Sequence, residues 1–329
     1  MTLGRTRTRR DVLLGGLGCA VAGALSRPAI ARTSWPTKSV KVVVPYAAGG
    51  GADTLCRLLC GHLQDALGQP FVIDNRGGGG GTIGAGAAAK AEPDGYTVLY
   101  DATAFSINPA LLSALPYDTS KDFVPVFLAG VVPNLLVANP SVQQSTVAEI
   151  IAAGKSDKGL DWASSGNGTV QHLSLELFRA QAGIKLNHIP YRGGAPALND
   201  IIGGHVKYMF SNAAASTPLV LSGTLKAIAH TGQGRLASLA NVPPVSDTLP
   251  GFVTHEWNGV FLPAGTPKDI VDRLNAALNA AIAAQAVVER MAQLSVTARA
   301  NTPAEFASFV AAEIERWAKV IRESNIKSE

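Results

Sequence analysis

Charged side chains, cysteines and long apolar runs are all scarce in this sequence of 329 residues. Only 16% of the residues are charged, although 47% are hydrophobic, which is too apolar for a disordered chain. Of 28 basic and 24 acidic side chains, five and one lie in the first 31 residues, which leaves 23 of each in the remainder. The net charge of +4 therefore belongs to the N-terminal segment, and the rest has no basic field for nucleic acid or an anionic membrane surface.

Chemistry-bearing clusters are also missing. The six histidines are scattered, and the chain has neither a G-x-S-x-G elbow nor a paired-carboxylate motif, so we expect no catalytic residues. Cys56 and Cys60 are four residues apart on a predicted helix, where parallel side chains are poorly placed for a disulfide. A metal site would need further His or Cys ligands, so we predict two buried thiols, no metal and no cofactor.

Residues 1–31 have the composition of an export signal. Arg9 and Arg10 precede an uncharged run over residues 12–25, which is too short to span a bilayer, and Ala29 and Ala31 flank a small-x-small cleavage pattern. These features predict a twin-arginine-like signal and a periplasmic protein. A lipid anchor at Cys19 is an alternative, but Gly16 stands where a lipobox normally has leucine. A second alternative to the export signal is that these residues form an amphipathic first helix, which the glycines in the segment disfavour. No later run is long enough to cross a membrane.

Strand and helix patterns alternate along the remaining chain. Short β-branched runs predict strands at 40–44, 71–73 and 96–100, and an i, i+3, i+4 stripe predicts a helix from Ala52 to Leu67 that ends at Gly68. Similar alternation continues through residues 161–229. The pairs Thr266-Pro267 and Thr302-Pro303, each followed by an acid, predict two helix starts. The pattern predicts an α/β fold of parallel sheets with helices on both faces.

Three glycine-rich turns stand between a predicted strand and a helix, at residues 45–53, 76–84 and 164–169. Such turns expose backbone N–H groups at the positive end of a helix dipole, which suits an anion. The second turn also matches G-x-G-x-x-G over residues 79–84, and Asp101 follows 17 residues later, as in a dinucleotide site. An exported nicotinamide- or flavin-dependent oxidoreductase is therefore an alternative function.

Taken together, the motifs resemble those of the Bug-type extracytoplasmic solute receptors, the substrate-binding proteins of tripartite tricarboxylate transporters. The resemblance covers nearly all of the chain after residue 31, in the order of the family. It rests on residues 45–53 with Arg57, 75–77, 81–84, 93–97, 165–169 with His172, Leu173 and Glu176, 190–193, 195–197, 257–259 and 263–267. The export signal departs from the family, in which the ordinary secretory route is common.

The resemblance implies a two-lobed periplasmic-binding-protein fold, each lobe a mostly parallel sheet flanked by helices, with the ligand in the cleft. Lobe one would comprise residues 32–132 and 254–329, and lobe two residues 133–253. Two chain crossings, near residues 131–136 and 251–257, would form the hinge.

By position in the family's motifs, a ligand carboxylate would lie between the first glycine-rich turn of lobe one and the Ser/Gly/Thr turn of lobe two. The predicted ligand contacts are Tyr46, Ala47, Ala48, Gly49, Thr103, Ser106, Ser165, Gly168, Thr169, His172, Tyr191 and Asn212. Several polar side chains have a structural alternative. Asp53 is better explained as a helix cap paired with Arg57, and His172 by capping of its helix. Tyr191 could instead pack against its neighbours. Arg192 could hold an anion, or it could be a solvated loop arginine.

The resemblance further implies a monomeric receptor that binds a small mono-, di- or aromatic carboxylate and delivers it to subunits of a membrane transporter. A receptor that senses the same solute for a signalling partner is the remaining alternative. Neither turn facing the ligand contains Lys or Arg, so we expect neutral donors to hold the anion.

Overall fold

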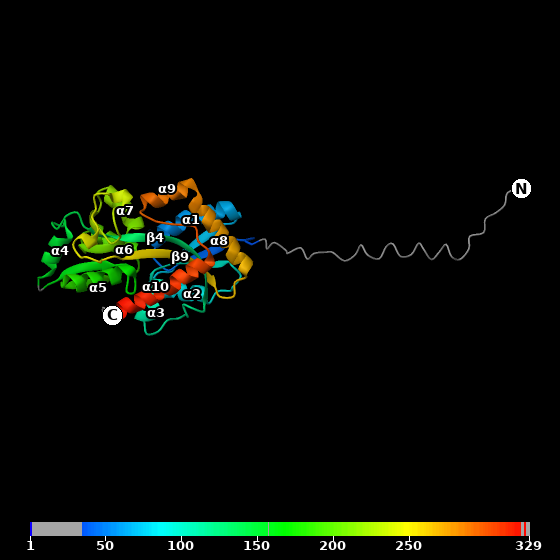
Figure 1. The fold of residues 1–329 in the computed structure, drawn as a ribbon, viewed down its shortest axis with the longest axis horizontal. Coiled ribbons are helices and arrows are strands. Elements are labelled where there is room, and N and C mark those ends of the chain that lie inside the picture. The colour runs from blue at the N-terminus through cyan, green and yellow to red at the C-terminus, as the bar shows by residue number, and fades with distance from the viewer. Residues whose placement is uncertain (2–34, 157, 324–325, 327–329) are drawn as a thin grey trace. The chain divides into compact units, whose positions relative to one another are not determined.

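The computed structural model describes residues 1, 35–156, 158–323 and 326. The predicted export signal, its arginine pair and Cys19 lie outside the described residues. From Trp35 onward the chain forms one body of strands and helices (Figure 1). The strands are β1 (Val40–Val44), β2 (Phe71–Asn75), β3 (Thr97–Ala102), β4 (Phe123–Ala138), β5 (Leu160–Ser164), β6 (Leu186–Pro190), β7 (Tyr208–Asn212), β8 (Lys226–His230) and β9 (His255–Pro263). The α-helices are α1 (Gly51–Leu67), α2 (Thr82–Ala89), α3 (Ala104–Leu111), α4 (Val147–Gly154), α5 (Val170–Ala182), α6 (Gly194–Ile202), α7 (Ala213–Leu221), α8 (Lys268–Ala283), α9 (Gln285–Gln293) and α10 (Pro303–Glu323).

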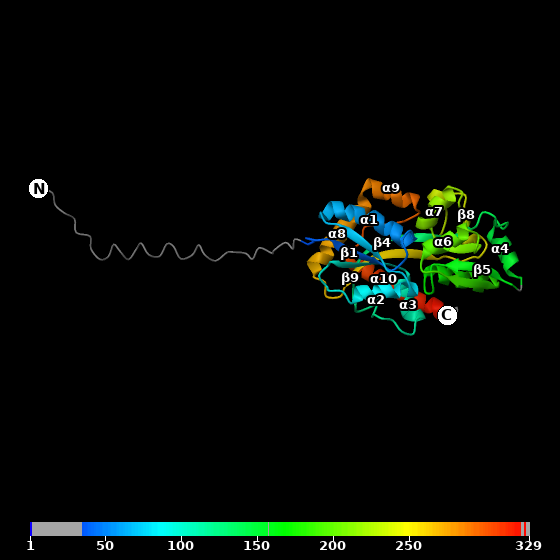
Figure 2. The same cartoon turned by 180° about the vertical axis from the view of Figure 1, so that it is seen from behind.

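The strands form two groups that share β4. The strand order is β2-β1-β3-β9-β4-β7-β5-β6, and β8 pairs with β4 as well. In Figures 1 and 2, α1, α2, α8 and α10 lie around the first group, while α4, α5, α6 and α7 lie around the second. The fold is thus the α/β, two-group architecture that the sequence predicts.

Strand β4 connects the groups, and the sequence pattern predicts neither β4 nor its antiparallel partner β9. The pairs β1–β2, β1–β3, β5–β6 and β5–β7 are parallel, but β9 is antiparallel to both β3 and β4. Strand β4 pairs with β9 up to Pro133 and with β7 from Asn134 onward. The change of partner lies within the predicted hinge crossing at 131–136.

Local signals place the helix boundaries. Gly68 adopts φ +73° and its N–H donates to the Gln64 carbonyl, which ends α1 as predicted. Thr302 and Glu305 form the predicted capping box of α10, with N–H to side-chain oxygen distances of 3.2 and 2.7 Å. The helix start predicted at Thr266-Pro267 is confirmed within one residue, but the predicted Thr266 cap does not form. The Thr266 hydroxyl donates to the Pro263 carbonyl at 2.7 Å, and α8 begins at Lys268 without a side-chain cap.

Separate aromatic clusters support the two groups of strands. Phe105, Phe261 and Phe306 pack in the first group, and Trp162 and Phe210 in the second. The predicted pair of buried thiols is confirmed: Cys56 and Cys60 are both buried and free, with their sulfur atoms 3.7 Å apart. Among the described residues, no helix is both long and apolar enough to cross a membrane.

Candidate functional site

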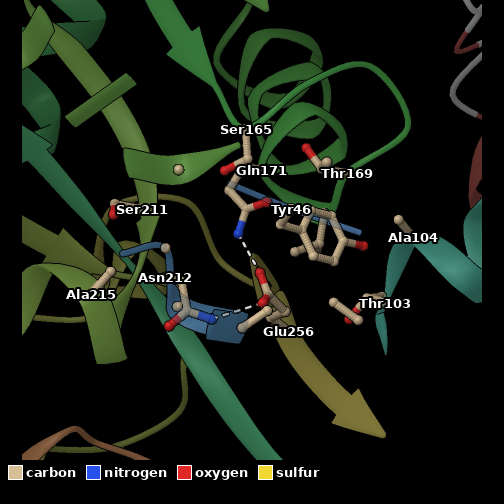
Figure 3. Close-up of a pocket in the computed structure, with 16 residues that line it drawn as sticks. Tyr46, Thr103, Ala104, Ser165, Thr169, Gln171, Ser211, Asn212, Ala215 and Glu256 are labelled. Atoms are coloured by element: carbon tan, nitrogen blue, oxygen red, sulfur yellow. Dashed lines mark hydrogen bonds between the residues drawn. The ribbon is translucent and has the colours of Figure 1, made fainter. Parts of the chain in front are cut away.

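Five helices begin at one cavity between the two groups of strands. The residues before or at the starts of α1, α3, α5, α6 and α7 all reach it, so their N-terminal dipole ends converge there (Figure 3). Its volume of about 30 Å³ has room for about two water molecules. This inner cavity is lined by Tyr46, Gly50, Gly51, Ala52, Ala102, Thr103, Ala104, Ser165, Thr169, Val170, Gln171, Gly194, Ser211, Asn212, Ala215 and Glu256.

The structure brings part of the predicted contact set to this cavity. The predicted residues that line it are Tyr46, Thr103, Ser165, Thr169 and Asn212. Two of them cap helices: the Thr169 hydroxyl accepts the His172 N–H at 3.4 Å, and the Asn212 amide oxygen accepts the Ala214 N–H at 2.8 Å. Contact of these five residues with a solute remains a prediction.

The remaining predicted contacts lie elsewhere. Ala48 and Gly49 line a separate surface depression beside Arg57 and Arg290. Ala47 lines neither this depression nor the inner cavity. The Ser106 hydroxyl is buried and donates to the Thr103 carbonyl at 2.8 Å. The structure therefore does not bring these side chains to the inner cavity.

Asp53 holds the first glycine-rich turn in place. Its carboxylate accepts the Gly49 N–H and the Arg57 Nε–H, each at 2.8 Å, and the Asn75 amide at 3.0 Å. Burial raises the pKa of Asp53, but these donors together lower it by more. The pKa therefore lies below its ordinary value. The predicted pairing with Arg57 is confirmed, but the predicted cap is not, because α1 has Gly50 at its N-cap position without a side-chain cap.

His172 is a buried, neutral side chain in the first turn of α5. Its ring stacks on His188 with centroids 4.4 Å apart, and the Gly168 N–H donates to its Nδ1 at 3.3 Å. Burial, together with the nearby His188, lowers the pKa of His172 to about 3. Neither Gly168 nor His172 lines the inner cavity, and the ring supplies no positive charge to it.

A second cavity adjoins the first. This outer cavity of about 220 Å³ is bounded by residues 78–81, 165–167 and 190–192 with Pro45 and Tyr46. Tyr191 lines it, but its hydroxyl donates to Asp200 at 2.5 Å. Arg192 is exposed at its rim.

The glycine-rich turn of the dinucleotide alternative packs against the facing loop. A Cβ on Gly80, which has φ +61°, would lie 2.2 Å from the Asn167 carbonyl oxygen. The Asn108 amide donates to the Gly80 carbonyl at 3.0 Å. The glycines thus serve a close approach between the two sides of the cleft. Asp101, the acid of the dinucleotide pattern, is buried and accepts the Tyr46 hydroxyl at 2.9 Å.

Gln171 and Glu256 are among the cavity residues that lie outside the predicted contact set. Gln171 is the second residue of α5 and donates through Nε2 to Glu256 at 2.5 Å and to Asn134 at 2.9 Å. Glu256 is a carboxylate on β9 and also accepts the Asn212 amide at 2.8 Å. The sequence does contain one indication of Glu256: it is an acid within the largely apolar stretch 255–263, where a buried charge is rare unless it has a partner.

The carboxyl groups near the cavity are held by neutral donors. Burial raises the pKa of Glu256 above its ordinary value, although the neutral amides of Gln171, Asn212 and Asn258 lower it in part. Burial likewise raises the pKa of Asp101 to about 7, against hydrogen bonds from the Ala102 N–H and the Tyr46 hydroxyl. None of the described residues lining the inner cavity is Lys or Arg. Within the described residues, no group of three His, Cys, Asp or Glu side chains could hold a metal ion.

The comparison with known families agrees with this geometry. Residues 55–326 match the profile described as "Tripartite tricarboxylate transporter family receptor". The chain belongs to this receptor family. The resemblance inferred from the motifs is therefore confirmed.

Individual relatives cover nearly the whole chain. Protein BugT of Bordetella pertussis is 36% identical over 96% of this chain and 98% of its own. Two solved structures from Rhodopseudomonas palustris are each 34% identical: Rpa4515 with adipate (TM-score 0.85, 89% of this chain and 99% of that one) and MatC with bound malate (TM-score 0.83, 87% and 99%). The chain therefore has the fold of the family's periplasmic solute-binding receptors.

Proposed function

We propose that the protein is a periplasmic receptor that captures a small organic carboxylate in the inner cavity and delivers it to a tripartite tricarboxylate-type membrane transporter. The family membership supports the receptor role, and the adipate and malate held by the two relatives support a carboxylate as the solute. The protein acts by binding rather than by catalysis.

The convergence of five helix starts carries this proposal. The first N–H groups of a helix have no partner within the helix, and its N-terminus carries the equivalent of about half a positive charge, so the five starts together favour an anion without any Lys or Arg. Hydroxyls of Thr103, Ser165 and Thr169 add donors beside the backbone groups. Hydrogen bonds to a charged group contribute roughly 1.5–3 kcal/mol each, so three or four support micromolar binding after the cost of association.

Solute capture requires opening and closing of the two groups of strands. The inner cavity is too small for an organic carboxylate as it stands, and its walls come from both groups. We assign residues 32–132 and 254–329 to one lobe and 133–253 to the other, with β4 and β9 as the crossings. Residues 1–31 would direct export by the twin-arginine route.

Thermal unfolding in the presence of a carboxylate panel tests the proposal. A ligand at 100 times its Kd stabilises the folded state by roughly 2.7 kcal/mol, so a bound solute raises the melting temperature measurably. The panel covers mono-, di- and aromatic carboxylates, with their uncharged amides as controls. We expect a shift with at least one acid and none with its amide. No shift with any carboxylate would contradict the proposed function.

A further inference from the structure

Glu256 is the one acidic side chain among the described residues that line the inner cavity. It is 6% exposed and lies on β9, where Figure 3 shows its carboxylate hydrogen-bonded to Gln171 and Asn212. Burying a carboxylate is costly unless it is paired, and an anionic solute beside it adds repulsion. A carboxylate receptor with this residue in its binding cavity therefore needs a chemical reason for it.

The hydrogen bonds of Glu256 leave acceptor capacity facing the cavity. Oε2 accepts one hydrogen bond from Gln171 and Oε1 accepts one from Asn212, and both donors are neutral amides. Each carboxylate oxygen has two lone pairs, so each retains one. No cationic side chain of the described residues pairs with Glu256. Asn258 is a further neutral amide beside the carboxylate, so Glu256 keeps acceptor capacity but has no cationic partner among the described residues.

The charges around the cavity are arranged with opposite signs on different elements. The positive helix ends belong to α1, α3, α5, α6 and α7. The acid that lines the cavity, Glu256, belongs to strand β9. A solute that carries both signs can place its carboxylate toward the helix starts and its cation toward the strand.

We propose that Glu256 pairs with a protonated amine of the solute, so the receptor selects amino carboxylates. This inference rests on the proposed function, since it names the solute class of the same cavity. The amine donates to the free lone pairs of Glu256 and removes the repulsion between the two carboxylates. Gln171 and Asn212 orient the Glu256 carboxylate for this contact.

Calorimetric titration with matched solutes tests the pairing. Three sets differ only in one substituent, hydrogen, hydroxyl or amine: propionate, lactate and alanine; succinate, malate and aspartate; 3-phenylpropionate, 3-phenyllactate and phenylalanine. We expect the amine member of the preferred set to bind at least about tenfold more tightly than the other two. Glu256→Gln keeps the side-chain shape and removes the charge, so it should reduce that preference to about threefold or less.

Glu313→Gln is the matched control variant. Glu313 is also 6% exposed, but it lies on α10, where it accepts the Trp317 indole N–H and pairs with Arg316. It should keep the amine preference of the unmodified protein. Because the comparison of the three substituents needs no variant, it stands even if Glu256→Gln folds poorly.

The outcomes separate this inference from the proposed function. If hydrogen or hydroxyl members bind as tightly as the amine member, or only carboxylates without an amine bind, the inference is overturned and the proposed function stands. An unchanged preference in a folded Glu256→Gln protein also overturns it. If neither these solutes nor the wider carboxylate panel bind, the proposed function itself fails, and the inference with it.

Discussion

At the residue scale, Thr169 connects the capping of α5 to the wall of the inner cavity. Its hydroxyl donates to the Gly166 carbonyl at 2.7 Å and accepts the His172 N–H. A bound carboxylate can take the hydroxyl proton in place of the carbonyl. We expect Thr169→Ala to weaken solute binding about ten- to a hundredfold, the equivalent of one charge-assisted hydrogen bond, and to cost about 1 kcal/mol of stability.

Thr169→Ser separates these effects from packing, because it retains the hydroxyl and loses only the methyl group. Its affinity for the carboxylate, measured by calorimetric titration, should stay within about threefold of the unmodified protein. Equal loss of binding in the serine and alanine variants would show that the hydroxyl is not the group that matters.

Asp101 should make the folded protein less stable as the pH rises. Its pKa is about 7 in the folded protein and 3.8 ordinarily, so the folded state keeps a proton that the unfolded chain releases. Below pH 4 both states hold the proton, and the free energy of unfolding has its full value. As the pH rises from 4 to 7, the unfolded chain alone releases the proton, and the free energy of unfolding falls by up to roughly 4 kcal/mol. Asp101→Asn cannot titrate, so its stability should rise relative to the unmodified protein across this interval.

Denaturant unfolding of both proteins between pH 4 and pH 8 measures this difference. Taking the difference removes the contributions of other titrating groups, apart from those of Tyr46 and Glu256, which interact with Asp101 directly. A stability difference that does not change with pH would mean that the Asp101 carboxyl titrates normally.

Sequence patterns predict the capping and hydroxyl residues of the cavity better than its acid. Ser165 and Thr169 lie in the glycine-rich turn before a predicted helix, so local sequence places them near a helix start. Glu256 and Gln171 meet through contacts 85 residues apart in the chain. Only the pairing of β9 with β3 and β4 brings Glu256 to the cavity, and no local pattern encodes that pairing.

At the element scale, the turn at residues 79–81 controls how closely the two sides of the cleft approach. Gly80 has φ +61°, and a Cβ there would meet the Asn167 carbonyl oxygen. We expect Gly80→Ala to weaken carboxylate binding by at least about tenfold, because the side chain holds the facing loops apart.

Gly183→Ala provides a control with the same backbone strain. Gly183 has φ +62° at the end of α5, and a Cβ there would meet nothing within 4 Å. Both variants should lose about 1 kcal/mol or more of stability from the left-handed conformation. Thermal melts and titrations distinguish the cases: if the two variants lose binding equally, strain rather than loop contact is responsible.

The elements that local sequence predicts well are those with short-range patterns. Strand β1 and helix α1 follow from a β-branched run and an apolar stripe that ends in glycine. Strands β4 and β9 lack such markers, because β4 continues for 16 residues through Pro125 and Pro133. Their antiparallel pairing depends on contacts between distant segments, which alternation of strands and helices does not reveal.

At the scale of the whole molecule, the two crossings near Pro133 and His255 should act as a hinge. β4 changes partners there, and Thr231 ties the crossings by accepting the Asn134 N–H at 2.9 Å and donating to the Thr254 carbonyl at 2.5 Å. Because residues from both groups of strands line the inner cavity, ligand binding should favour the closed form. Small-angle scattering should show a smaller radius of gyration at saturating carboxylate, whereas an unchanged radius would argue against closure.

A crystal structure with the carboxylate that gives the largest thermal shift tests the central claim most directly. The account predicts that the carboxylate lies in the inner cavity, with its oxygens about 2.7–3.1 Å from backbone N–H or hydroxyl donors at the helix starts. Density for the carboxylate on the Arg192 guanidinium in the outer cavity, with the inner cavity unoccupied, would contradict it.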